Sequence, residues 1–349
     1  MYFTHPQFKK FNLKPFFAKY SESELREKLA KFFPNFHIIF TDSGRSAFQI
    51  AIKELGLGNS EILIPAYICD IFLPIFKKYN IKPIYLDIDF NTFHLKISEI
   101  EEKITPQTKS ILICHTYGLP VKIDKILEIS QKYNLKIIED CAHIFPSKIS
   151  GDCAFLSFSK LCPTIDGGML VSRKNPDNLL LNKFSSQASN FIKFLRLFPC
   201  LAELSERFRR SEKTLATKEF SSPRQPSKQS LRIFNWYLDN FNKQIKKRID
   251  LAKYFQQELK KLGFEIQEAQ DNNFTYLSAL VPKNLDRNKL FIKLRKKHIF
   301  CSRIWRNPIF PNLPNTSEIA RRVINFPLQN WFTKKDINKI ISGILSDKD

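Results

Sequence analysis

The sequence predicts an α/β fold: a mostly parallel central sheet with helices on both faces, followed by a smaller C-terminal α+β domain. Between residues 36 and 172, short apolar runs alternate with amphipathic stretches, which is the pattern of βαβ units. After residue 235, long helical stretches surround a single strand-like run. The chain has 349 residues, too many for one small core. We therefore expect a large domain over residues 1–235 and a small domain over 236–349.

The expected strands of the large domain are short apolar runs bounded by turn residues. They lie at 36–41, 61–65, 83–88, 109–115, 135–140, 153–158 and 168–172. Apolar residues at helical spacing predict intervening helices over 46–57, 70–80 and 123–134. Strands separated by helices run parallel, so their carboxyl ends are expected to meet at one edge of the sheet.

Residues 182–230 interrupt this alternation with a basic amphipathic helix pair, broken at Pro199, and a linker over 221–230. The stretch 190–210 has two interpretations. It is either a membrane-surface helix or a helix facing the core or a partner subunit, and we favour the second. In the small domain we expect a helix over 234–263, a strand over 273–282, and helices over 288–299 and 333–345.

Composition narrows the class of protein. The formal net charge of +22 fits either polyanion binding or a Lys-rich solvated surface, and no motif points to nucleic acid. The seven cysteines form no C-x-x-C pair, which favours reduced thiols in the cytosol over a disulfide framework or a zinc site. We expect no metal. Neither a signal peptide nor a run of about 20 apolar residues is evident, so we expect a cytoplasmic protein, peripheral at the inner membrane face only if 190–210 meets lipid.

Polar residues follow the expected strands at the edge where open parallel sheets bind ligands. Ser43, Gly44 and Arg45 open a helix, so backbone N–H groups and a guanidinium are available for an anion. The later strand ends carry the other candidates: Tyr67, His115, Tyr117, Asp140, His143, Ser157 and Lys160. Taken one at a time, such residues are more often caps, ion-pair partners or structural histidines than catalytic groups.

The combination is more specific than its members. An anion site, a carboxylate after an apolar strand and a lysine about twenty residues later are the groups that bind pyridoxal phosphate. The phosphate would lie on the helix N-terminus, Asp140 would keep the pyridine nitrogen protonated, and Lys160 would form the Schiff base. Lys160 stands between an apolar run and the pair Gly167–Gly168, surroundings that we expect to favour its neutral amine.

In this order the motifs resemble those of the DegT/StrS-like sugar aminotransferases, which are fold-type I pyridoxal phosphate enzymes. The similar segments are S-G-x-x-A (43–47), I-P-A-Y (64–67), Y-L-D-I-D (85–89), T-P-Q-T-K-S-I (105–111), H-T-Y-G (115–118), I-I-E-D-C-A-H (137–143), S-F-x-K (157–160) and D-G-G (166–168). A closing segment, A-R-R-V-I-N-F-P-L-Q (320–329), is similar too. The resemblance is dense over 36–175 and loose over 235–345.

The resemblance implies roles for particular residues. Lys160 would be the Schiff-base lysine and proton shuttle, with Asp140 as the partner of the pyridine nitrogen. His143 takes the family's Gln/His position beside the ring. Ser157 and the Gly44–Arg45 backbone would hold the phosphate.

The resemblance also implies an activity and an assembly. The family's usual reaction moves an amino group from glutamate to a nucleotide-linked keto-sugar, in polysaccharide or amino-sugar biosynthesis. Its members are homodimers with active sites at the interface. In this chain the candidates for substrate contacts are His115, Tyr117, Arg303, Trp305 and Arg306, the last three for a nucleotide or diphosphate.

Three features depart from the family pattern. The spacing from Ser157–Phe158 to Lys160 is shorter than usual. Cys69 takes the position of the aromatic residue that usually stacks on the cofactor, and Tyr67 is a candidate replacement. The family's Asn-containing segment, which reaches the neighbouring subunit's phosphate, is not recognisable before residue 234.

Two alternatives to an aminotransferase remain open from the sequence. One keeps pyridoxal phosphate but catalyses sugar dehydration; the presence of Lys160 favours transamination instead. The other is a non-catalytic basic binding or regulatory protein on the same scaffold. The survival of every polar member of the constellation argues against it.

Overall fold

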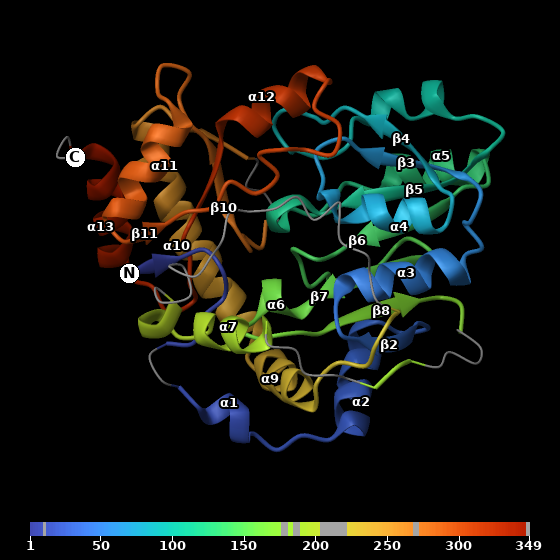
Figure 1. Cartoon of the computed structure of the whole chain (residues 1–349), viewed down its shortest axis with the longest axis horizontal. Coiled ribbons are helices and arrows are strands. Elements are labelled where there is room, and N and C mark those ends of the chain that lie inside the picture. Colours follow the sequence, from blue (N-terminus) through green and yellow to red (C-terminus); the bar gives the residue numbers. More distant parts are fainter. Residues whose placement is uncertain (10–11, 176–180, 184–188, 203–221, 268–271, 347–349) are drawn as a thin grey trace.

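The computed structural model describes residues 1–9, 12–175, 181–183, 189–202, 222–267 and 272–346. Two parts lie side by side (Figure 1). One contains the central sheet and its covering helices, and the other is a smaller group of helices and strands that holds both chain termini.

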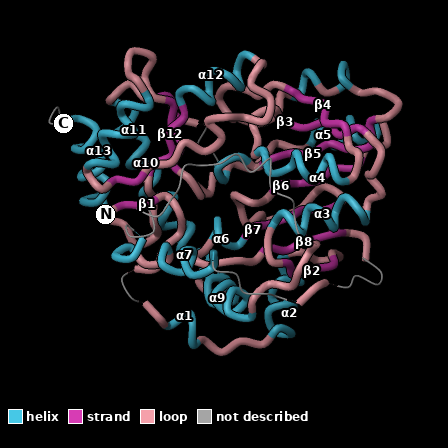
Figure 2. The backbone as a smooth tube through the Cα atoms, in the orientation of Figure 1, coloured by secondary structure: helices cyan, strands magenta, loops and turns pink. Residues whose placement is uncertain are grey.

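The central sheet has seven strands in the order β2-β8-β7-β6-β5-β3-β4. Neighbours from β7 to β4 are parallel, whereas β8 is antiparallel to both β2 and β7. The connection from β7 to β8 is too short for a crossover, which explains the reversal. The predicted mostly parallel sheet is therefore confirmed (Figure 2). The strands are β2 (His37–Thr41), β3 (Glu61–Pro65), β4 (Lys82–Leu86), β5 (Thr108–Cys114), β6 (Lys136–Asp140), β7 (Cys153–Ser157) and β8 (Gly168–Ser172).

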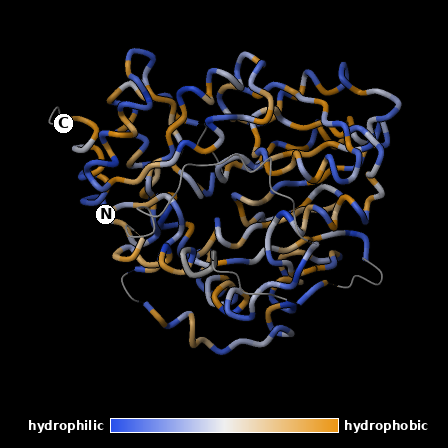
Figure 3. The backbone as a smooth tube through the Cα atoms, viewed as in Figure 1, coloured by the Kyte–Doolittle hydropathy of each residue, from blue (hydrophilic) through white to orange (hydrophobic). Residues whose placement is uncertain are grey.

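Helices cover both faces of this sheet because its strands are apolar on both sides. On β6, Ile138 packs with α3 (Gly44–Glu54) and α4 (Leu73–Lys78), and Ile137 packs on the opposite face with α5 (Asp124–Lys132). Farther along that second face, α2 (Glu22–Phe32) and α9 (Lys228–Leu238) cover β7 and β8. Apolar residues accordingly concentrate along the strands (Figure 3).

The second part has its own apolar core, built by residues 251–344. Its antiparallel sheet has the order β12-β10-β9, and β1 pairs in parallel with β11. Its elements are α10 (Phe241–Lys261), α11 (Arg287–Lys296), α12 (Pro314–Arg322), α13 (Lys334–Leu345), β1 (Tyr2–Phe3), β9 (Glu265–Ile266), β10 (Leu277–Leu280), β11 (Ile299–Phe300) and β12 (Val323–Phe326).

Short elements complete the described chain. They are α1 (Lys14–Phe17), α6 (Phe158–Leu161), α7 (Ser189–Arg196) and the 3₁₀ turns η1 (Asp70–Phe72), η2 (Ile97–Glu99), η3 (Glu101–Lys103) and η4 (Thr116–Gly118). Among the described residues, no helix combines the length and the apolar character needed to cross a membrane.

Two expectations from the sequence need correction. The helix expected over 234–263 is two helices, α9 and α10, because the chain leaves helical geometry at Asn240. The expected linker 221–230 ends in helix, since α9 begins at Lys228 with Ser227 as its cap. In the basic insert, Leu197, Phe198 and Ala202 are buried, which favours the core-facing interpretation for these residues; 184–188 and 203–221 lie outside the described residues.

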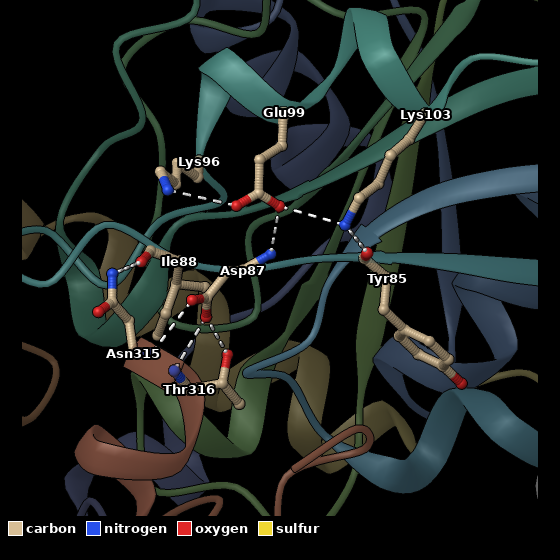
Figure 4. Close-up of polar contacts among 8 residues, drawn as sticks. All are labelled: Tyr85, Asp87, Ile88, Lys96, Glu99, Lys103, Asn315 and Thr316. Atoms are coloured by element: carbon tan, nitrogen blue, oxygen red, sulfur yellow. Dashed lines mark hydrogen bonds and ion pairs between the residues drawn. The ribbon is translucent and has the colours of Figure 1, made fainter. Parts of the chain in front are cut away.

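A buried carboxylate joins the two parts of the molecule. Asp87, just after β4, accepts hydrogen bonds from Asn315 N (3.1 Å), Thr316 N (2.9 Å) and Thr316 Oγ1 (2.9 Å) at the start of α12 (Figure 4). Asn315 Nδ2 also donates to Ile88 O at 2.7 Å. Glu99 holds the Asp87 segment in turn by accepting from Asp87 N at 3.0 Å.

Candidate functional site

The site is centred on Asp140, the last residue of β6. Successive strand residues face opposite sides of a sheet, so Asp140 shares the α3 side with Ile138. Its carboxylate is buried and accepts from Ala142 N at 2.9 Å, and Cys114 Sγ lies 3.7 Å away. Burial raises the pKa of Asp140, and Lys160 partly offsets this effect. A buried carboxylate in this position needs a cationic partner.

Lys160 reaches the same place from α6, a single helical turn after β7. The spacing from Ser157–Phe158 to Lys160 is shorter than in the family pattern, yet this turn brings Lys160 Nζ to 3.2 Å from His143 Nε2. The Gly167–Gly168 pair makes this arrangement possible. A Cβ on Gly168 would lie only 2.5 Å from Ser43 C, so only glycine lets β8 begin against the 43–44 turn.

Hydrogen bonds fix the tautomer of His143. Tyr117 N donates to His143 Nδ1 at 3.2 Å, so in the neutral ring the proton lies on Nε2 and faces Lys160. The pKa of His143 is held well below its ordinary value by burial and by Lys160. His143 is therefore a neutral N–H donor at physiological pH, directed at the amine of Lys160.

The protonation of Lys160 differs from the expectation. Burial alone would lower its pKa, but the electrostatic influence of Tyr276, Cys69 and Asp140 outweighs burial, and the pKa of Lys160 is raised. The apolar residues on either side of Lys160 in the sequence gave no indication of these partners, which are distant along the chain. With Lys160 protonated, its ammonium and the N–H of His143 are two hydrogen-bond donors that face each other. This contact is unfavourable, and a third group that accepts a hydrogen bond from both would make it favourable.

The N-terminus of α3 lies beside this pair. Ser43 caps the helix by accepting from Ser46 N at 3.3 Å, and a Cβ on Gly44 would contact Ser157 Cβ at 3.4 Å. Ser157 and the Gly44–Arg45 backbone are thus neighbours, as the phosphate site requires. Burial lowers the pKa of Arg45, and Asp42 and Cys69 partly offset this.

These residues fit pyridoxal phosphate. They provide an amine, a buried carboxylate, a neutral N–H donor and a helix N-terminus with small residues around it. Asp140 would hold the ring nitrogen, His143 a ring substituent, Ser157 and the start of α3 the phosphate, and Lys160 the aldehyde carbon.

An aromatic wall closes the site on the small-domain side. The hydroxyls of Tyr67 and Tyr117 lie 2.6 Å apart, and both donate to Ile304 O at 3.1 and 3.0 Å. Trp305 follows with φ 57° and stacks on His143 at 5.3 Å between ring centroids. The Tyr67 hydroxyl is used in this junction, and Cys69 lies in the electrostatic environment of Lys160. The rings that pack on His143 are therefore Trp305, Tyr117 and Tyr276.

His115 lies away from this cluster. As the neighbour of Cys114 it faces the α5 side of the sheet, where its Nε2 contacts Glu139 Oε2 at 3.0 Å and its Nδ1 accepts from Val121 N at 3.0 Å. Both nitrogens are occupied, so the structure gives His115 a positioning contact and does not bring it to Lys160. Cys141 lies within 4.8 Å of these ligand atoms, but Glu139 also accepts from Ser150 N and Gly151 N.

The two arginines suggested for a diphosphate belong to a larger basic group. Arg303 Nη1 donates to Asn288 Oδ1 at 2.7 Å and its guanidinium stacks on Phe291. Burial, Arg303 and Arg306 lower the pKa of Arg287 to about 10. Arg287 was missed from the sequence because its position at the start of a basic helix looks like ordinary surface charge. Tyr67 also acts electrostatically on Arg287, so the three arginines lie beside the aromatic wall.

The sequence is similar to those of known proteins over most of its length. The profile of the DegT/DnrJ/EryC1/StrS aminotransferase family matches residues 17–193 and 233–345. A dTDP-4-amino-4,6-dideoxy-D-glucose transaminase of Shigella dysenteriae is 26% identical over 349 aligned residues, covering 92% of this chain and 88% of that protein. A GDP-perosamine synthase of Escherichia coli O157:H7 is 34% identical over 140 residues, covering 37% of this chain and 38% of that protein.

Solved structures have the same fold. An aminotransferase from Psychrobacter cryohalolentis has a TM-score of 0.73 at 15% identity, covering 99% of this chain and 98% of that chain. An E. coli GDP-4-keto-6-deoxy-D-mannose-3-dehydratase with bound hydrated PLP has a TM-score of 0.73 at 18% identity, covering 99% and 100%. The predicted fold-type I class is confirmed.

Proposed function

The chain belongs to the DegT/DnrJ/EryC1/StrS aminotransferase family, which depends on pyridoxal phosphate, and we propose that it transfers an amino group from glutamate to a nucleotide-linked keto-sugar. The observation that carries this proposal is the convergence of Lys160, His143 and buried Asp140 at one sheet edge. We further propose that it works as a homodimer in polysaccharide or amino-sugar biosynthesis, in the cytoplasm.

Each residue of the site has a separate role in the proposed reaction. Pyridoxal phosphate, when bound, supplies the electron sink that transamination needs. The buried carboxylate of Asp140 stabilises a proton on the ring nitrogen, because a neighbouring charge in a low-dielectric site is weakly screened. Lys160 Nζ holds and returns the proton that moves at the substrate carbon, as a general base and then a general acid. His143 Nε2–H and Trp305 orient the ring and exclude water.

The basic group supports a nucleotide substrate. Arg303 and Arg306 both repel Arg287 electrostatically, and Arg287 lies beside Tyr67, which packs on Trp305. A diphosphate bound by Arg287 would relieve this repulsion while the aromatic rings pack on the sugar. A dehydratase remains the second candidate, because the E. coli dehydratase shares the fold.

Cofactor binding tests the enzyme class. The purified protein with added pyridoxal phosphate should show a visible absorption band that borohydride removes, and Lys160→Ala should lack the borohydride-trapped adduct. Glutamate should convert the bound cofactor to its amino form, and a panel of nucleotide keto-sugars should restore it. A protein that stays colourless and ignores the cofactor would contradict the proposal. Sugar deoxygenation without amination would favour the dehydratase.

A further inference from the structure

A cavity of about 310 Å³ opens beside Lys160, on the side of the N-terminal segment and α10. This volume is at the small end of the range for small-molecule sites, about 300–1,000 Å³. Four cationic residues contribute to its lining: Lys9, Lys160, Lys247 and Arg248. None of its described lining residues is acidic. A concave site with positive charge and no carboxylate attracts an anion.

Arg248 is the strongest sign that a ligand belongs here. Its side chain is 8% exposed, and its Nε donates to Asn273 O at 2.9 Å. Among the described residues no carboxylate pairs with it. Burial lowers its pKa to about 10, which still leaves it charged. A buried charge without a counter-ion is costly, so such a residue is normally paired.

Two unpartnered oxygens on the cavity wall give an independent sign. Thr275 is 7% exposed, and its Oγ1 has no hydrogen-bond partner among the described residues. Asn330 Oδ1 is likewise unpartnered, although Asn330 Nδ2 donates to Gln244 Oε1 at 2.8 Å. Buried polar atoms are nearly always hydrogen-bonded in folded proteins. The cavity therefore presents a guanidinium, a hydroxyl and an amide oxygen that a bound molecule can satisfy together.

We propose that this cavity receives the carboxylates of the amino donor, a small dicarboxylic amino acid, with Arg248 as their main partner. The donor amine must reach the cofactor carbon that Lys160 would hold, where it would replace the lysine amine, while the negative charges of the donor are neutralised. This cavity contains Lys160 together with Arg248, an arginine that no described carboxylate pairs. The amide oxygen of Asn330 suits an amino acid better than a purely anionic ligand, because it can accept from an ammonium. This inference rests on the proposed aminotransferase function and adds a binding site to it.

Glutarate, an unreactive dicarboxylate, tests the proposal without turnover. Trp236 and Trp331 line the cavity, so tryptophan fluorescence should report binding directly. We expect saturable glutarate binding in the full-length protein, at least tenfold tighter than binding of inorganic phosphate. Arg248→Gln should weaken glutarate binding on the order of tenfold to a hundredfold, because it removes a charged hydrogen-bond partner.

Matched variants separate the site from general charge and from misfolding. Lys246 is an exposed neighbour on α10 outside the cavity lining, so Lys246→Gln removes the same charge and should leave binding unchanged. Thr275→Val should fold normally, because its hydroxyl has no partner to lose, and should weaken glutarate binding by about threefold to tenfold. Thr275→Val therefore keeps the test valid if Arg248→Gln fails to fold.

The outcomes are distinguishable from those of the proposed function. No glutarate binding, binding unaffected by both Arg248→Gln and Thr275→Val, or phosphate binding as tight as glutarate binding would each overturn the donor site. The borohydride-trapped adduct at Lys160 is measured separately. If the adduct forms and glutarate does not bind, only this inference fails; if glutarate binds and no adduct forms, the aminotransferase proposal fails.

Discussion

Replacing Asp87 with alanine should loosen the attachment of α12 to the central sheet. The carboxylate of Asp87 is 5% exposed and accepts three hydrogen bonds from Asn315 and Thr316, and Thr316 is fully buried (Figure 4). The N-cap residue of α12, Leu313, offers no side-chain cap, so Asp87 satisfies the N–H groups of the first turn from more than two hundred residues earlier in the chain. Ile319 and Ala320 of α12, and Val323 directly after it, pack in the cluster that includes Tyr67 and Tyr117.

The magnitude follows from the groups that lose their partner. Loss of a helix cap costs roughly 0.5–2 kcal/mol, and loss of a partly buried charge at a helix N-terminus up to about 2 kcal/mol. Leaving buried donors unsatisfied adds about 1–3 kcal/mol. These effects overlap, so we expect Asp87→Ala to lower the free energy of unfolding by about 3–5 kcal/mol. Asp87→Asn keeps the shape and one acceptor and should cost about half as much.

A local cap gives the matched comparison. Asp286 caps α11 by accepting from Asn288 N and Lys289 N (2.9 Å for the latter), but it is exposed and joins no distant segment. Asp286→Ala should therefore be clearly less destabilising than Asp87→Ala. Urea unfolding at neutral pH, followed by circular dichroism and tryptophan fluorescence, measures both. If Asp87→Ala is no more destabilising than Asp286→Ala, the reasoning about the junction is wrong.

Two further predictions concern stability and the cofactor site. His94 is buried, its Nε2 contacts Leu119 O at 3.1 Å, and burial and His115 lower its pKa to about 3. The unfolded chain therefore binds one more proton below pH 6.5, and stability should fall by about 1.4 kcal/mol per pH unit as pH drops toward 3. His94→Gln should reduce this slope in acid titrations of unfolding, and an unchanged slope would refute the assignment. Gly168→Ala should push β8 from Ser43 and Gly44, where its Cβ would meet backbone at 2.5 and 2.6 Å, and should cost about 2 kcal/mol or more. Gly58→Ala, whose Cβ would have its nearest neighbour at 3.5 Å, is the control, and equal stability and equal pyridoxal phosphate binding in the two variants would contradict the packing argument.

The sequence predicted the features that depend on local pattern. The strand ends that carry Asp140 and Lys160 follow from apolar runs and from the geometry of parallel sheets, so those two residues were found together. Arg248 was missed, although a signal existed: it falls on the same helical face as Leu251, Ala252 and Phe255, all buried. A charged residue on an apolar helical stripe is an indication of a buried site.

Features that depend on contacts between distant parts of the chain could not be predicted from the sequence pattern. Trp305 was a candidate for a diphosphate contact, but its stacking on His143 requires the docking of the small domain and a left-handed backbone at residue 305. The raised pKa of Lys160 also arises from partners distant in sequence, Tyr276 above all. Apolar neighbours along the chain predicted the desolvation of Lys160 correctly and could not reveal the charges that oppose it.

The simplest rival interpretation of Lys160 is a structural ion pair with Asp140, and the geometry argues against it. Within the described part of the chain, the two residues influence each other's pKa, yet no ion pair within 4.0 Å joins them. Lys160 instead faces the N–H of His143, and Asp140 is held by Ala142 N. A structural pair would gain by direct contact, because separated buried charges lose most of their attraction while still losing hydration. A carboxylate and an amine that are kept apart, with a neutral donor turned toward the amine, are arranged for a third group between them.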